Sequence, residues 1–129
     1  MMSRMDGAQV VRGLAQAESL DFITKVEVDT SKKMSITILN RSGTSQKIGM
    51  IMPDMEIQKE GAVVWSTKNR ERGLPVYEAE LPDQSETKII EMSLDFQPPD
   101  RGMYSLELTR VVSNPNTLPV PQAVAFEVR

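Results

Sequence analysis

Acidic side chains concentrate in one short stretch of this sequence, and paired carboxylates are the groups that perform general acid–base chemistry. A glycosidase-like acid pair could be drawn from either of two groups. The same acids alternate with apolar neighbours or fall in turn segments, where solvated carboxylates are common, so we expect surface acids rather than a catalytic pair. The two groups are Glu78, Glu80, Asp83 and Glu86, and the pair Asp54 and Glu56.

The 129-residue sequence contains neither cysteine nor histidine. Without cysteine there are no disulfides, thiolate zinc sites, iron–sulfur clusters or cysteine nucleophiles. Without histidine there is no Ser-His-Asp triad and no histidine metal site. We also find no calcium-loop spacing, phosphate-binding glycine run or nucleophile elbow. The sequence therefore predicts a protein that is not an enzyme and that holds no cofactor and no metal.

Basic residues alternate through the polar segment from Ser66 to Pro75, at Lys68, Arg70 and Arg72. This segment could contact an acidic protein surface, a phosphate, or a protease cleft that prefers basic residues. It is short and mixed in sign, and only Trp65 lies beside it as a stacking residue, which argues against a nucleic-acid footprint. The alternative is a solvated loop.

Three prolines stiffen the segment from Asn114 to Pro121. Pro115, Pro119 and Pro121 fix their own φ angles and push the preceding residues toward extended conformations. An ordered extended segment loses less conformational entropy when it binds, so Leu118 and its neighbours could form a rigid recognition edge. The alternative is a stiff arch that connects two strands of the domain.

Two weaker motifs have structural alternatives as well. Trp65, Tyr77 and Tyr104 could form a sugar-stacking platform, but single aromatic side chains in a sandwich usually anchor the core or cover its rim. The sequence from Asn40 to Ser42 matches a glycosylation sequon, and we interpret it as a turn.

Charge and hydropathy give little indication of a partner class. The formal net charge is -3, which provides neither the basic field that nucleic acid and anionic lipid attract nor an acidic tail. No segment approaches the ~18 apolar residues of a membrane span. Asp6 and Arg12 interrupt the apolar run that a secretory signal would need. We expect a cytoplasmic protein that binds neither nucleic acid nor membrane.

Apolar residues recur with period two from Leu20 onward, which indicates strands with one buried and one wet face. The "KEG" turn predicts a three-residue hairpin loop with Gly61 in the left-handed conformation, which would turn Val63 and Trp65 inward. We count about eight strands, the number typical of an antiparallel sandwich. The inward-facing apolar residues include Met34, Met50, Met52, Met55 and Met92, and we expect them to pack between the sheets rather than form a docking surface.

The N-terminal segment differs from the rest of the chain. Between Ala8 and Glu18, Val10, Val11, Leu14 and Ala17 could share one helical face. We therefore predict an N-terminal extension over residues 1–19, partly disordered or forming a short helix, and one all-β domain with an immunoglobulin-like antiparallel sandwich over residues 20–129.

The order of several motifs resembles the intracellular proteinase inhibitors of the Bacillus type. The resemblance rests on "MSITILNRSGTSQKI", the hairpin "MEIQKEGAVVWS", the turn "LPDQSET", and "PDRGMYSLELT" followed by "PQAVAFEVR". It spans about Leu20 to Arg129. The chain departs from the family pattern at "MIMPDME" and at "LPVYEAE", where only Tyr77 is aromatic.

The resemblance implies a small immunoglobulin-like sandwich that binds and inhibits a subtilisin-like intracellular serine protease. The expected contact residues then lie in the two exposed segments described above: Asn114, Pro115, Leu118, Pro119, Pro121, Lys68, Arg70 and Arg72. A structural or assembly module with the same fold is the alternative, since a fold by itself does not determine function.

Overall fold

The computed structural model describes residues 9–67 and 76–129, and these residues form an all-β protein. Every strand pairing within them is antiparallel. The strands, in chain order, are β1 (Val10–Val11), β2 (Gly13–Glu18), β3 (Phe22–Val28), β4 (Lys33–Asn40), β5 (Gln46–Ile51), β6 (Asp54–Lys59), β7 (Ala62–Ser66), β8 (Val76–Leu81), β9 (Ser85–Ser93), β10 (Gly102–Arg110), β11 (Ser113–Asn114) and β12 (Ala123–Val128).

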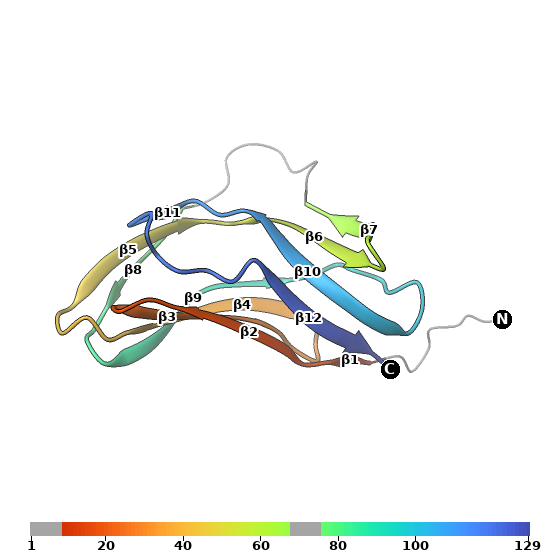
Figure 1. The fold of residues 1–129 in the computed structure, drawn as a ribbon, viewed down its shortest axis with the longest axis horizontal. Helices are drawn as coiled ribbons and strands as arrows, with labels where there is room; N and C mark the ends of the chain where they lie inside the picture. Colours follow the sequence, from red (N-terminus) through yellow and green to blue (C-terminus); the bar gives the residue numbers. More distant parts are fainter. Residues whose placement is uncertain (1–8, 68–75) are drawn as a thin grey trace.

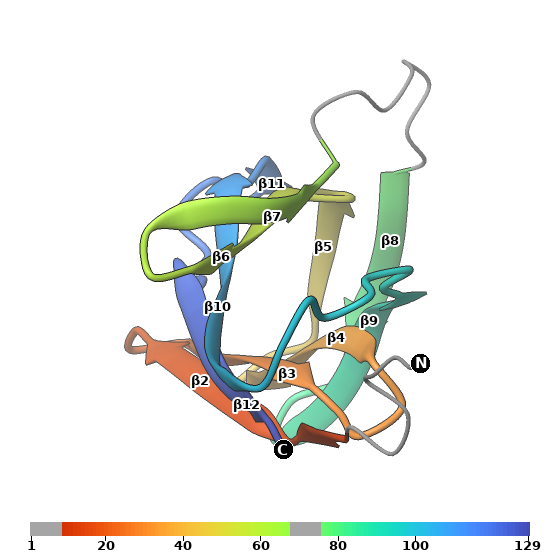
Figure 2. The ribbon, with the colours of Figure 1, turned by 90° about the vertical axis from the view of Figure 1, so that its right-hand side faces the viewer.

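The strands form two layers, which confirms the predicted antiparallel sandwich (Figures 1 and 2). One layer is a four-stranded sheet in the order β2-β3-β4-β9. The other has two parts, β1-β12-β10-β6-β7 and β11-β5-β8. These parts are joined where β5 runs into β6 through Met52 and Pro53, and where β10 runs into β11 (Figure 1). The sequence indicated about eight strands, whereas the described residues form twelve; the additional strands include β1 and β2 in the N-terminal segment and the two-residue β11.

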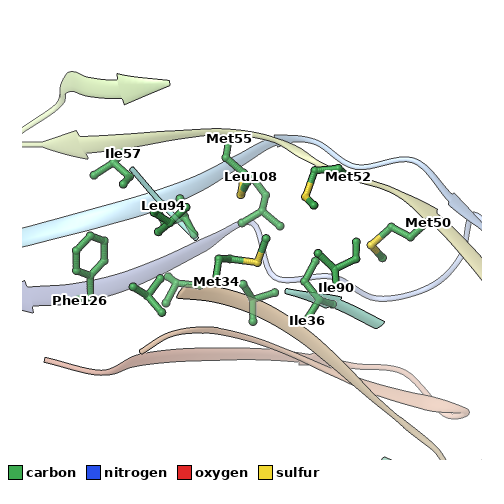
Figure 3. Packing of buried hydrophobic residues seen from close by; sticks show 14 of the residues in the cluster. Met34, Ile36, Met50, Met52, Met55, Ile57, Ile90, Leu94, Leu108 and Phe126 are labelled. Carbon is green, nitrogen blue, oxygen red and sulfur yellow. The ribbon is translucent and has the colours of Figure 1, made fainter. Parts of the chain in front are cut away.

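Methionines fill much of the space between the layers, as predicted. Met34, Met50, Met52 and Met55 are buried, and Met92 is partly buried against them. Figure 3 shows the first four of these side chains, from both layers, extending into one core together with branched aliphatic residues. Flexible thioethers suit the irregular gaps between twisted sheets. The methionines on predicted inward positions are therefore core residues.

Tyr104 connects this core to the turn before β10. Its ring packs against Phe96 and Phe126, at centroid distances of 5.4 and 5.8 Å. Its hydroxyl donates to the Asp100 carbonyl oxygen at 2.6 Å, four residues upstream. A tyrosine at the start of a strand that bonds back to the preceding turn is the tyrosine corner of immunoglobulin-like sandwiches. This contact supports the immunoglobulin-like form of the predicted fold.

The β6–β7 hairpin is confirmed, but its details differ from the prediction. Lys59 pairs with Ala62, so the loop has two residues, Glu60 and Gly61, and both have positive φ (53° and 84°). A register shift between Ile57 and Gln58 then places an extra residue in β7. Because a bulge reverses which side chains face inward, Val63 is half exposed rather than buried.

The predicted N-terminal helix is wrong for the described part of the segment. β1 pairs with β12, and β2 pairs with β3 along its whole length. Gly13 lies so close to β12 that a Cβ atom there would be 2.3 Å from the Ala125 carbonyl oxygen. Pairing with β12, at the other end of the chain, and with β3, the next strand, thus imposes an extended backbone that the local sequence pattern does not reveal. Leu20, the first residue of the predicted domain, is exposed in the β2–β3 turn.

Asn40 holds together two loops at one end of the sandwich. The side chain is fully buried, and its amide nitrogen donates to the Thr44 and Leu81 carbonyl oxygens at 2.8 Å each. Its amide oxygen accepts from the Ser42 backbone N–H at 3.0 Å. The predicted turn is therefore present. Attachment of a glycan to this nitrogen would disrupt both of its hydrogen bonds.

Candidate partner-binding groove

An open groove of about 570 Å³ lies over the β11-β5-β8 sheet. In β5, Ile48 and Met50 point into the core, so the alternating residues Lys47, Gly49 and Ile51 face outward. Their partners across the sheet share that face. The outer surface therefore consists of short cross-strand rows that the pairing register defines.

The first row is apolar. Ile51 pairs with Val76 of β8, and its N–H donates to the carbonyl oxygen of Val112, which precedes β11. Val76 is 60 % exposed and Val112 is 41 % exposed. Exposed apolar side chains are unremarkable when they are scattered, but neighbouring ones that line a hollow indicate a contact surface.

The second row is centred on Gly49, where the absence of a side chain leaves open space. Gly49 lies between Asn114 of β11 and Glu78 of β8. A Cβ atom at Gly49 would meet its nearest neighbours only at 3.8 to 4.0 Å, which is ordinary contact, so this glycine leaves space rather than avoiding a clash. The next row consists of Lys47 and Glu80. Along the groove, the surface thus changes from apolar to open to charged.

The predicted proline segment is an arch whose interior belongs to the core. Leu118 is 6 % exposed, and Pro121 is buried as well. Within the arch, the Leu118 N–H donates to the Pro115 carbonyl oxygen at 3.3 Å, and the Ser113 hydroxyl donates to the same oxygen at 2.9 Å. Leu118 therefore packs largely in the core.

The other arch residues differ in their access to a partner. Pro115 and Pro119 are half-buried, while Asn114 is exposed. Asn114 is the predicted contact residue that lines the groove. Most of the segment is thus an arch that connects two strands, and its first residue, Asn114, also lines the groove.

The predicted basic residues Lys68, Arg70 and Arg72 lie outside the described residues. Their flanking residues are described. Thr67 is buried and its hydroxyl accepts from the Met55 N–H at 2.8 Å, whereas Val76 lines the groove. The described residue that follows the segment thus belongs to the groove, and the one that precedes it does not.

The candidate acids do not converge on one site. Asp83 accepts a hydrogen bond from the Gly43 N–H at 2.8 Å, and Glu86 pairs with Lys25 at 2.8 Å. Glu78 and Glu80 alternate on the outer face of β8. Within residues 9–67 and 76–129, no three histidine, cysteine or acidic side chains are grouped as a metal site would require. Asp83 and Glu86 are thus engaged in separate structural contacts.

The aromatic residues are also divided. Tyr104 is buried in the core, which removes it from any sugar-stacking platform. Trp65 is partly buried, and its indole N–H donates to the Asp95 carboxylate at 2.8 Å. In the described part of the chain, there is also no helix long and apolar enough to cross a bilayer.

Sequence reasoning missed the groove, although one signal was present. Ile48, Met50 and Met52 already occupy the inward positions of their strand, so Ile51 is an apolar residue at an outward position. The position of Val112 beside Ile51 could not be predicted, because the two residues are far apart in the sequence. Comparisons of this chain with protein-family models, with curated proteins and with solved structures find no match, so the family resemblance rests on the sequence motifs alone.

Proposed function

We propose that this chain is a non-catalytic protein-binding domain. The observation that carries the proposal is an apolar row beside a hollow in the sheet surface, in which Val76 and Val112 are exposed and Ile51 is partly buried. Removing apolar surface from water contributes about 25 cal/mol per Å², so such a row favours a contact that covers it. The described residues that line the groove include one acid, Glu78, and one lysine, Lys47, and we propose binding as the function for which this geometry is suited.

The more specific form of this proposal is inhibition of a subtilisin-like intracellular serine protease. Its support is the resemblance to the Bacillus-type inhibitors. An inhibitor must insert an extended, pre-organised segment into the protease cleft. Burial of Leu118 disfavours the arch for that role. The segment with Lys68, Arg70 and Arg72 is then the stronger candidate for insertion.

Titration of such a protease with the purified protein tests inhibition. We expect loss of activity at a one-to-one ratio, and we expect the combined change of Lys68, Arg70 and Arg72 to alanine to weaken inhibition at least about tenfold. The Asn116→Ala protein, altered at an exposed arch position, is the matched control. Ready digestion of the wild-type protein without inhibition would contradict this form of the proposal.

An assembly module is a second candidate, and the last strand of one sheet favours it. β7 is the terminal strand of its sheet, and its sequence "AVVWS" carries no charge, with Val63 and Val64 exposed. Natural proteins usually protect edge strands with charges or prolines, so an uncharged edge suits pairing with another chain.

Co-purification from native cells separates the two candidates. Recovery of a protease supports inhibition, whereas recovery of a multi-protein complex that is lost in the Val64→Lys protein supports assembly through β7. Retention of that complex by Val64→Lys would contradict a role for this edge.

A further inference from the structure

We propose that the groove over the β11-β5-β8 sheet binds an extended segment of a partner protein that carries an apolar side chain and, two residues further along, a lysine or arginine. This inference rests on the proposed protein-binding function and specifies its ligand. The surface involved consists of Ile51, Val76 and Val112, followed by Gly49, Asn114 and Glu78.

The spacing of the rows matches that of an extended chain. The apolar row at Ile51 and the open row at Gly49 are two residues apart along β5. Alternate side chains of a strand point the same way and lie about 6.6 Å apart, since each residue advances about 3.3 Å. A strand aligned with β5 therefore places side chains i and i+2 over consecutive rows.

Charge determines what the second side chain is. Among the described residues, the Glu78 side chain has no hydrogen-bond or ion-pair partner, and Glu78 lines the groove beside Gly49, with its Cγ atom 3.8 Å from where a Cβ atom of that glycine would lie. A cationic side chain entering the hollow would meet this acid and the Asn114 amide. One row further it would meet Glu80 together with the ammonium group of Lys47, which offsets the attraction of that acid. The basic residue is thus favoured in the second row over the third.

The size of the groove favours a segment over a globular surface. Ten of the described residues line it, whereas each side of a standard protein–protein interface contributes about 20–30 residues. A second copy of this chain is a poorer fit. If the same face packed against itself around Gly49, the two hollows would face each other and leave unfilled space, which costs packing energy.

Titration of the isotopically labelled protein with blocked pentapeptides, followed by amide NMR shifts, tests the inference. The probes are Ser-Leu-Ser-Arg-Ser, Ser-Leu-Ser-Glu-Ser and Ser-Ser-Ser-Arg-Ser. We expect the first peptide to bind most tightly, with the largest shifts at Gly49, Ile51, Val76 and Glu78. Glu78→Gln should weaken its binding about three- to fivefold, as expected for a partly exposed charge pair, and leave the acidic peptide no weaker. Glu60→Gln, in the β6–β7 turn, is the matched control and should change nothing.

Filling the hollow provides the second variant. Gly49→Leu should abolish peptide binding while the remaining amide spectrum stays that of a folded protein, because there is room for a side chain at this position. If that variant does not fold, Val76→Thr, which keeps the branched shape and removes apolar surface, should weaken binding severalfold.

Three outcomes would overturn the inference: no peptide-dependent shifts in the groove, equal binding by Gly49→Leu, or concentration-dependent shifts at the same residues without peptide, which would indicate self-association. Failure here is distinguishable from failure of the proposed function. A native partner that is captured equally by wild-type protein and Gly49→Leu would show protein binding at another surface.

Discussion

At the scale of single residues, Asp100 illustrates an acid that serves structure rather than chemistry. Its carboxylate accepts hydrogen bonds from the Lys59 ammonium and from the Tyr104 hydroxyl. The Lys59 hydrogen bond, followed by that from Tyr104, holds the pKa of Asp100 below its ordinary value of 3.8. The same pairing with Asp100 raises the pKa of Lys59. This small network fastens the turn that precedes β10.

The lowered pKa of Asp100 predicts a pH dependence of stability. Above about pH 3.8 the carboxylate is ionised in both folded and unfolded chains, so its stabilising contribution is fully present. As the pH falls from there through the lower pKa of the folded state, the contribution is lost. Asp100→Asn should therefore flatten the acid side of the curve of unfolding free energy against pH, measured by urea unfolding between about pH 2 and pH 7.

Lys59→Met tests the cause of that dependence. Since the Lys59 hydrogen bond is the largest reason for the lowered pKa, this variant should flatten the same acid limb. An acid limb as steep as that of the wild-type protein in both variants would show that Asp100 is not responsible.

At the scale of elements, the proline arch contains both a buried residue that anchors it and an exposed residue that does not. Leu118 lies in the core and Asn116 is exposed, although only two positions separate them. Leu118→Ala should lower the free energy of unfolding by about 2–4 kcal/mol, because it leaves a cavity, whereas Asn116→Ala should stay within about 0.5 kcal/mol of wild type. Denaturant unfolding measures both. Equal, small effects would mean that Leu118 does not anchor the arch.

Two glycines in strands provide a second comparison. Gly13 is where β2 approaches β12, and an added Cβ would lie 2.3 Å from a backbone oxygen. Gly13→Ala should therefore force the strands apart and destabilise the protein by about 1–3 kcal/mol. Gly49→Ala has room and should be neutral or stabilising by up to about 1 kcal/mol, because glycine weakens a strand. Thermal unfolding of both variants checks the difference, and similar melting temperatures would argue against the close approach.

The hairpin of β6 and β7 shows which features of an element are readable from sequence. The turn at Gly61 was predictable because glycine is strongly favoured at positive φ. The bulge was not, because Val63 and Val64 are both apolar and no alternation marks the extra residue. The same limitation hid the exposure of Val63. Period-two patterns thus locate strands well. They show which side chains point into the core only where the strand contains no bulge.

At the scale of the whole molecule, the sequence predicted the two-layered architecture and most of its core. Alternation alone placed Met34, Met50 and Met55 inside, where the structure has them. The candidate site was less predictable, because the groove combines β5, β8 and the residues before β11, which are remote in the sequence. β1 was missed for the same reason, because its partner β12 lies at the other end of the chain. β2 was missed because its apolar residues also fit one face of a helix, although its partner β3 is the next strand.

The N-terminal strands therefore predict the outcome of a truncation. β1 joins one layer through β12 and β2 joins the other through β3, so residues 10–18 connect both layers of the sandwich. A chain that starts at Leu20 loses both strands, leaves β3 as a new sheet edge, and uncovers core residues such as Val26 and Phe126. We expect the free energy of unfolding to fall by several kcal/mol, from the roughly 5–15 kcal/mol typical of a domain, so that this chain unfolds or aggregates.

A chain that starts at Gln9 keeps every described strand and serves as the control. Circular dichroism during heating compares the two, and a Leu20 chain that melts at the same temperature as the Gln9 chain would restore the view of residues 1–19 as a dispensable extension.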